Sequence, residues 1–153
     1  TETREAIARL DTRRTQQSKA PCGGFVFEDA VAELVIATVA DGPYVAEPTG
    51  ASAGSITRCK KGDVVVRFTA ESAFDGAAVV FEAKRDGSYT VAQALAELEI
   101  ARKNRDACAG VFVMAVSHAP IGFPRFGRHG NNVLVQSAWS RTRAPHYERC
   151  IST

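Results

Sequence analysis

The stretch that decides the fold runs from Lys60 to Lys84 and reads KKGDVVVRFTAESAFDGAAVVFEAK. Within it, Val79–Lys84 is a short apolar, β-branched run that ends just before an Asp-Gly turn, and this pattern predicts a β-strand. Because side chains alternate between the two faces of a strand, we expect Val80, Glu82 and Lys84 to point the same way. A carboxylate and an ammonium then lie on one face, about 6 to 7 Å apart at the usual rise per residue.

A second strand is predicted at Asp63–Phe68, where an acidic residue opens another β-branched run. If the two strands form a hairpin, antiparallel pairing places Asp63 beside the Lys84 end of its partner. Asp63, Glu82 and Lys84 then converge at one end of the sheet. Mg²⁺ prefers one or two protein carboxylates and leaves its other positions to water and phosphate oxygens, so this set suits phosphodiester hydrolysis. A turn aspartate beside an exposed strand face is the plainer interpretation of the same residues.

These residues also resemble a known signature. Gly62-Asp63, followed further along by Phe81-Glu82-Ala83-Lys84, is similar to the motif of the PD-(D/E)XK nuclease superfamily. One departure is Gly62, because many members have proline at that position. This difference bears on the turn more than on the metal chemistry.

The resemblance implies a restriction-endonuclease-like core: an α/β fold with a mixed central sheet of about four to five strands flanked by helices, in the order αβββαβ. It implies a hydrolase that cuts DNA as an endonuclease or exonuclease with Mg²⁺ or Mn²⁺. Asp63 and Glu82 would hold the metal with the Ala83 carbonyl as an added ligand, and Lys84 would orient or deprotonate the attacking water. A lysine acts as a base only where its surroundings depress its pKa, so both roles of Lys84 stay open.

A helix is predicted from about Phe25 to Ala40, because apolar residues recur there at helical spacing. The expected buried stripe consists of Phe27, Val31, Leu34, Val35 and Thr38. Glu28 lies one residue off this stripe, and glycines followed by a Phe-Glu pair at the start of the helix also resemble the family. Glu28 is predicted either to look toward Asp63 as a catalytic residue or to be a first-turn acid that the helix dipole favours.

A second helix is predicted from about Thr90 to Arg105, with Thr90 and Gln93 forming a capping box. Relatives of the suspected family place a functional glutamine on this helix, so Gln93 is also a candidate site residue.

The apolar run Gly110–Val116 predicts a central strand covered on both faces, and the strand-helix-strand order implies that it runs parallel to Val79–Lys84. Short strands are expected at Tyr44–Thr49 and Asn131–Gln136, with a loop at Ile121–Gly130.

Basic residues supply the candidate contacts to a DNA backbone. The set consists of Lys60, Lys61, Arg85, Arg125 and Arg128. Solvated surface charge is the plainer interpretation of any one of them. In the loop Ile121–Gly130, arginines alternate with Phe123 and Phe126, which suits stacking on bases. A loop that tucks both phenylalanines under one end of the sheet would show the same pattern.

Composition sets the class of protein. The chain has 153 residues, 45% of them hydrophobic, so one core is expected in residues 21–153, after an N-terminal helical arm or linker at residues 1–20. The net charge of +2 is too small to identify a nucleic-acid binder by itself. Four cysteines without zinc spacing, and no apolar run of membrane-spanning length, predict reduced thiols, a cytoplasmic protein and no membrane partner.

Functions from different classes stay open. The first is a metal-dependent deoxyribonuclease whose partner is DNA. The second is a catalytically inactive nuclease-like domain that binds DNA or another protein, as a homodimer or within a larger multidomain chain joined through the N-terminal helical arm. An enzyme that uses Cys59 or Cys108 is a third, although neither cysteine has a partnered histidine close by in the sequence.

Overall fold

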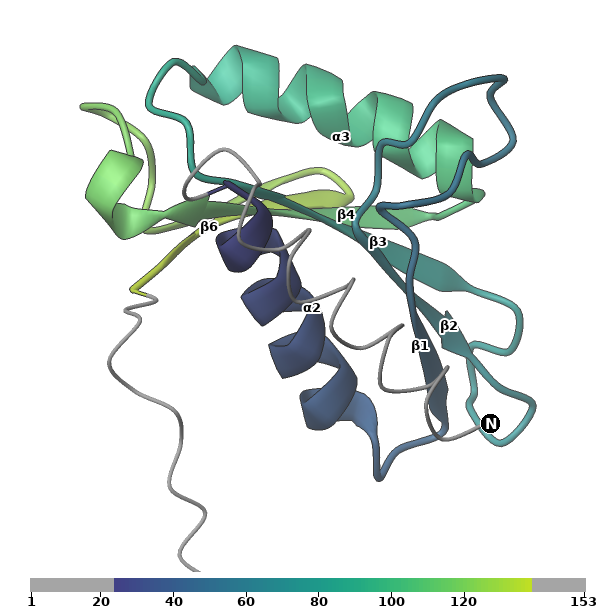
Figure 1. The fold of residues 1–153 in the computed structure, drawn as a ribbon. Helices are drawn as coiled ribbons and strands as arrows, with labels where there is room; N and C mark the ends of the chain where they lie inside the picture. Colours follow the sequence, from purple (N-terminus) through teal and green to yellow (C-terminus); the bar gives the residue numbers. More distant parts are fainter. Residues whose placement is uncertain (1–23, 139–153) are drawn as a thin grey trace, which may run out of the picture.

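The computed structural model describes residues 24–138 and has an α/β architecture with one mixed sheet and two α-helices (Figure 1). The arm predicted at residues 1–20 and the tail with Trp139 lie outside the described residues. In chain order the elements are α2 (Gly24–Val39), β1 (Tyr44–Pro48), β2 (Val64–Phe68), β3 (Ala78–Lys84), α3 (Val91–Arg105), β4 (Ala109–Ala115), a 3₁₀ turn (Val116–His118), β5 (Phe126–His129) and β6 (Asn132–Ser137). Within the described part, no helix combines the length and apolar character needed to cross a bilayer.

The sheet has six strands in the order β1-β2-β3-β4-β6-β5. The predicted hairpin is confirmed, because β2 and β3 pair antiparallel with Val64 opposite Phe81. The predicted crossover is confirmed as well, since β3 and β4 run parallel with Lys84 opposite Met114. Strand β6 then pairs parallel to β4, and β5 returns antiparallel along its outer edge.

The strand count is where the sequence prediction was wrong. Six strands are present instead of four to five, and the extra one, β5, occupies Phe126–His129 within the stretch predicted to be a loop. This four-residue edge strand is defined by its pairing with β6. Its own sequence, mostly polar and with a glycine, does not predict a strand. The two phenylalanines of the stretch also separate: Phe123 is buried, whereas Phe126 is 71% exposed.

Two apolar layers fix the helices against opposite faces of the sheet (Figure 1). Helix α2 packs through Phe27 and Val31 on a cluster that includes Ala83 and Val113. On the other face, Ala94 and Leu98 of α3 pack on the sheet in a second cluster. Its other members are Phe112, Met114, Phe123 and Leu134. Burial of these side chains is the main favourable term in holding the sheet end rigid between two helices.

The two helices match their predicted bounds closely. The capping box on α3 is confirmed: Thr90 Oγ1 accepts from the Gln93 N–H, and Gln93 Oε1 accepts from the Thr90 N–H at 2.8 Å. In α2, Phe27 and Val31 are buried as predicted, but Leu34 is 63% exposed and Thr38 is exposed too. Helical periodicity gives the direction of a side chain around the axis, but not how far along the helix the sheet covers it.

Candidate functional site

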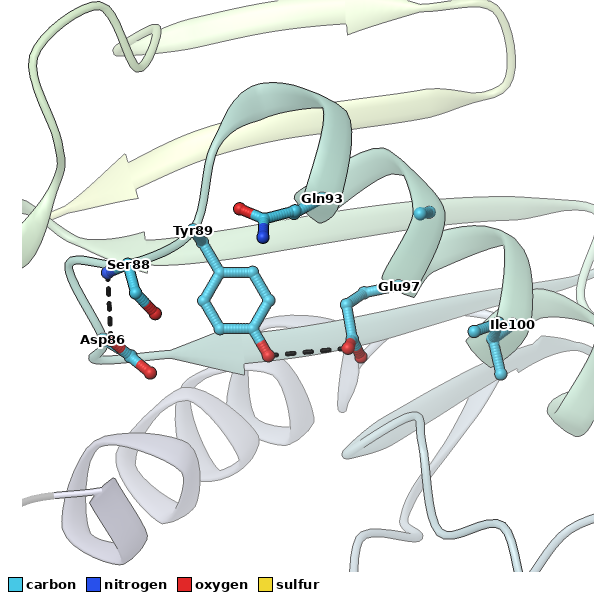
Figure 2. A pocket seen from close by; sticks show the side chains of 7 residues that line it. Asp86, Ser88, Tyr89, Gln93, Glu97 and Ile100 are labelled. Carbon is cyan, nitrogen blue, oxygen red and sulfur yellow. Dashed lines mark hydrogen bonds between the residues drawn. The ribbon is translucent and has the colours of Figure 1, made fainter.

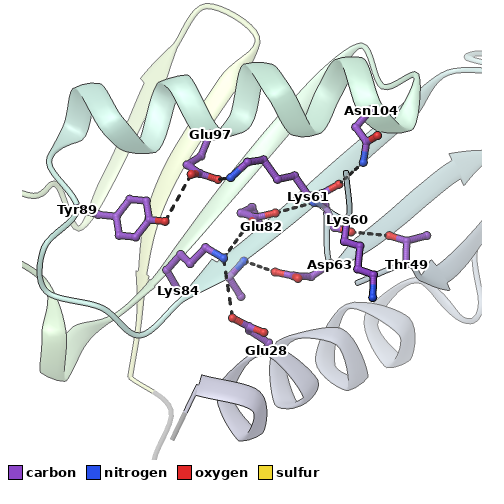
Figure 3. Close-up of polar contacts among 12 residues, drawn as sticks. Glu28, Thr49, Lys60, Lys61, Asp63, Glu82, Lys84, Tyr89, Glu97 and Asn104 are labelled. Atoms are coloured by element: carbon purple, nitrogen blue, oxygen red, sulfur yellow. Dashed lines mark hydrogen bonds and ion pairs between the residues drawn. The ribbon is translucent and has the colours of Figure 1, made fainter. Parts of the chain in front are cut away.

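The hairpin of β2 and β3 brings Asp63 directly beside Glu82 and Ala83 (Figure 3). The Asp63 N–H donates to the Phe81 carbonyl at 2.8 Å, which extends the ladder by one residue beyond β2. In return, the Ala83 N–H donates to Asp63 Oδ2, also at 2.8 Å. The backbone N–H of Ala83 therefore holds the Asp63 carboxylate near the C-terminal end of β3.

Glu82 is a buried carboxylate, with only 2% of the residue exposed. Its Oε2 accepts a hydrogen bond of 2.6 Å from the Gly62 N–H, and its Oε1 contacts Lys84 Nζ at 2.9 Å. A buried charge of this kind needs both a counter-charge and hydrogen bonds to be tolerated. The turn at Gly62 and the side chain of Lys84 provide them.

Lys84 links the sheet to α2. Its Nζ lies 3.9 Å from Glu28 Oε1 as well as 2.9 Å from Glu82. The first turn of α2 contains no acidic residue, so the prediction of Glu28 as a first-turn dipole partner is wrong. The alternative, that Glu28 looks toward the sheet residues, agrees with the structure, which places Asp63, Glu82, Lys84 and Glu28 in one cluster (Figure 3).

Burial, together with an excess of negative over positive groups, shifts the pKa values of the cluster. Burial and the neighbouring Glu82 carboxylate raise the pKa of Asp63 from 3.8 to about 7. Burial also raises the pKa of Glu28, more than Lys84 lowers it. Burial alone would lower the pKa of Lys84, but the surrounding acids, first of all Glu82, outweigh it and raise that pKa above its ordinary value. In the metal-free protein the surrounding acids thus favour the ammonium form of Lys84, which suits it to orienting groups and stabilising negative charge.

The donor atoms suit a hard divalent cation. Asp63 and Glu82 offer two carboxylates, which is the number that Mg²⁺ commonly takes from protein. The Ala83 carbonyl lies on the same side of the strand as its N–H, hence on the Asp63 side. Burial, and after it the neighbouring Glu82 carboxylate, raise the pKa of Asp63, and a bound cation would offset both effects. No group of three or more His, Cys, Asp or Glu arranged to hold a metal occurs within residues 24–138, so protein would provide only part of the ligand shell.

The basic residues predicted to contact DNA lie at two separate places on the sheet. Lys60 is exposed on the turn before Asp63, and Arg85 is exposed directly after Lys84. Arg128 is on β5 and Arg125 directly precedes it, at the sheet edge farthest from β1, so neither joins the acidic cluster. Arg125 still belongs to the same end of the sheet as Lys84, because its carbonyl accepts from Gln136, the residue paired with Met114 opposite Lys84.

Lys61 and Gln93 have structural partners. The Lys61 ammonium forms an ion pair with Glu97 of α3 and contacts no acid of the cluster through a described ion pair. Gln93 closes the capping box with its amide oxygen. Glu71 and Asp75, the acidic residues of the loop between β2 and β3, are exposed.

Sequence reasoning missed the residues that hold the turn in front of Asp63. Arg105 lies in the last turn of α3, where the helix dipole favours a basic residue, yet it is only 6% exposed. Its guanidinium donates to main-chain carbonyls of Thr49, Ser52, Lys60 and Lys61. Asn104, 1% exposed, donates to the carbonyls of Cys59 and Lys61. The only available signal was that three basic residues at one helix end exceed what the dipole requires.

Comparisons with known proteins give no relative from which this cluster could be interpreted. No family model, curated protein or solved structure matches the chain. The functional conclusion therefore depends on the geometry of Asp63, Glu82, Lys84 and Glu28.

Proposed function

We propose that this chain is a metal-dependent nuclease of the PD-(D/E)XK type that hydrolyses DNA phosphodiester bonds, as an endonuclease or exonuclease, with Mg²⁺ or Mn²⁺. One observation carries the proposal: the half-buried Asp63, directly before β2, and the buried Glu82 of β3 meet an ammonium, Lys84, at one end of the sheet. The succession α2-β1-β2-β3-α3-β4 supports the restriction-endonuclease-like core that the motif implies, and β6 and β5 extend its sheet.

Each residue has a separate role in this proposal. Asp63 and Glu82 would hold the cation, with the Ala83 carbonyl as a further donor. The bound metal ion supplies a more acidic water and positive charge for the phosphate oxygens. Lys84 keeps its proton, orients the attacking water and offsets charge that develops on the phosphate. Glu28 balances Lys84 from the side of α2, and the exposed Lys60 and Arg85 would contact the DNA backbone near the cleaved bond.

One observation favours a second function, a DNA- or protein-binding module with no catalysis. Both oxygens of Glu82 already have protein partners, Gly62 N–H and Lys84 Nζ, and Asp63 Oδ2 accepts from Ala83 N–H. The cluster is thus largely satisfied without a metal. In a module of this kind Asp63, Glu82 and Lys84 would join the sheet end to the preceding turn and do nothing more.

Mg²⁺ and Mn²⁺ titration by calorimetry separates the two. For a nuclease we expect wild-type protein to bind the metal, Asp63→Asn to lose binding, and Asp75→Asn, an exposed loop aspartate, to keep it. The same titrations are repeated with a short phosphorothioate DNA duplex present, so that a site completed by phosphate oxygens is also detected. Binding to neither wild-type sample would contradict the nuclease and favour the binding module.

Cleavage of plasmid and linear DNA completes the test. Lys84→Ala should lower the rate by roughly a hundredfold or more, while Lys103→Ala, which removes an exposed lysine of α3, should leave it unchanged. Lys84→Met is assayed beside Lys84→Ala, and urea unfolding of both Lys84 variants guards against a variant that is inactive only because it unfolds. Cleavage at the wild-type rate by either Lys84 variant would overturn the proposed mechanism.

A further inference from the structure

A pocket of about 340 Å³ lies on the α3 side of the sheet (Figure 2). Two of its residues, Tyr89 and Glu97, are beside the acidic cluster in Figure 3. Its lining consists of Asp86, Ser88, Tyr89, Gln93, Ala96, Glu97 and Ile100. The Tyr89 ring lies between Asp86 and Glu97, and its hydroxyl is 3.5 Å from Glu97 Oε1 (Figure 2). Pockets for small ligands begin at roughly 300 Å³, so this one suits a single planar group and nothing larger.

The pocket and the cluster are connected through protein. Glu97 pairs with Lys61, which precedes Gly62 and Asp63 on the same turn (Figure 3). Asp86 follows Lys84 by a single intervening residue, Arg85. A chain whose phosphate approaches Lys84 therefore has its adjoining group within reach of this pocket.

The polar atoms of the pocket indicate what it would accept. Asp86 and Glu97 are acceptors at opposite sides of the Tyr89 ring, and a carboxylate keeps free lone pairs after accepting two hydrogen bonds. The Gln93 amide oxygen is held by the Thr90 N–H, so the amide group has its NH₂ donors left for the pocket. Two acids make the interior unfavourable for a phosphate. A flat ring that carries N–H donors on its edge fits both the acids and the face of Tyr89.

We propose that this pocket receives the base next to the cleaved phosphate, and that it favours bases that carry an amino group, cytosine and adenine, over thymine. This inference rests on the proposed function, because it takes a nucleic-acid strand as the substrate. Tyr89 stacks on the base, while Glu97 and Asp86 accept from its amino group. Thymine presents a carbonyl oxygen where cytosine presents the amino group, so it offers no donor at that position to Glu97 and Asp86.

The test is binding of labelled single strands, dC8, dA8 and dT8, measured by fluorescence anisotropy in Ca²⁺. Wild-type protein should bind dC8 and dA8 roughly tenfold more tightly than dT8, since a good set of base-edge hydrogen bonds discriminates by at least this factor. Ala96→Phe places a ring in the pocket without touching Asp63, Glu82 or Lys84, and should bring all three strands to the dT8 affinity. The matched control is Ala37→Phe, at an exposed alanine of α2 on the other face of the sheet, which should keep the preference.

Failure of this inference differs from failure of the nuclease proposal. If wild-type protein binds and, in Mg²⁺, cleaves all three strands equally, the pocket does not select a base and only this inference is overturned. A preference that survives in Ala96→Phe would overturn it too, because the selecting group then lies elsewhere. If no strand binds, only this inference is overturned, because the duplex titrations and plasmid cleavage decide the nuclease proposal separately.

Discussion

The main-chain N–H of Gly62 donates to Oε2 of Glu82 at 2.6 Å, and Gly62 holds a φ of +96° to do so. Proline has neither an N–H nor access to positive φ. The glycine that departs from the family signature is therefore required by this backbone, because it carries one of the two groups that hold the buried Glu82 carboxylate. The other is Lys84 Nζ, 2.9 Å from Oε1.

Gly62→Ala should cost about 3 kcal/mol of unfolding free energy or more. The new methyl would meet a strained φ and would also lie 2.8 Å from both Arg105 Cγ and Val80 Cγ2. Gly76→Ala is the matched control, since Gly76 has a φ of +79° but nothing within 4 Å of the added carbon; it should cost only about 1 kcal/mol. Urea unfolding of the three proteins measures the difference. Equal losses would show that φ alone matters and that Gly62 is not packed as described.

Asp63 should make the metal-free protein less stable as pH rises. Its pKa is about 7 in the folded chain and 3.8 as an ordinary aspartate. Between these values the unfolded chain releases a proton that the folded chain keeps, so the unfolding free energy falls from pH 4 to pH 7, by on the order of 4 kcal/mol. Glu28, whose pKa is also raised, adds to the same slope.

Unfolding in urea with EDTA, repeated across this pH range, checks the sign and the residue. Asp63→Asn should show a much shallower slope and should exceed wild type in stability at pH 8, because the amide has no charge to bury. Asp75→Asn should keep the wild-type slope, since Asp75 is exposed in a loop. A steep slope that persists in Asp63→Asn would assign the buried proton to another group.

Breaking the Lys84–Glu82 pair should be costly, whereas removing both partners should not. Lys84→Met leaves the Glu82 carboxylate, 2% exposed, with Gly62 N–H as its remaining described partner, and we expect a loss of about 3 kcal/mol. Glu82→Gln/Lys84→Met removes both charges and should recover most of that loss. A double-mutant cycle in urea at pH 7, completed by Glu82→Gln, measures the coupling. No recovery in the double variant would mean that Lys84 contributes by packing and not by its charge.

The part of this site that sequence could predict is the part that follows from strand alternation and hairpin pairing. Val64 to Phe68 and Val79 to Lys84 are β-branched runs with one short connection, and antiparallel pairing then brings Asp63 to the Glu82 end. The capping box was equally local, because Thr90 and Gln93 are three residues apart. Whether Lys84 orients or deprotonates the attacking water was open in the sequence, since its pKa depends on three acids that come together only in the fold.

The parts that sequence missed depend on contacts between distant segments. Strand β5 has no apolar pattern of its own and exists as the partner of β6. Glu97 was not among the predicted site residues, and only its ion pair with Lys61 in the folded chain places it beside the cluster. Arg105 contacts carbonyls more than forty positions away, and local charge patterning has no means of showing this.

Substitution of Arg105 tests whether this side chain of α3 holds the turn in front of Asp63. Arg105→Met would leave the carbonyls of Thr49, Ser52, Lys60 and Lys61 without their guanidinium donor, and we expect a loss of about 3 to 5 kcal/mol. Arg102→Met, one turn earlier, removes a pair with the half-exposed Glu99 and should cost about 1 kcal/mol or less. Arg105→Lys should recover little, since one ammonium does not reproduce a planar fork of donors. If the loss arises at the turn, amide hydrogen exchange will rise at Gly62 and Asp63 while α3 stays protected; exchange that rises along α3 instead would place the role of Arg105 in the helix and not in the site.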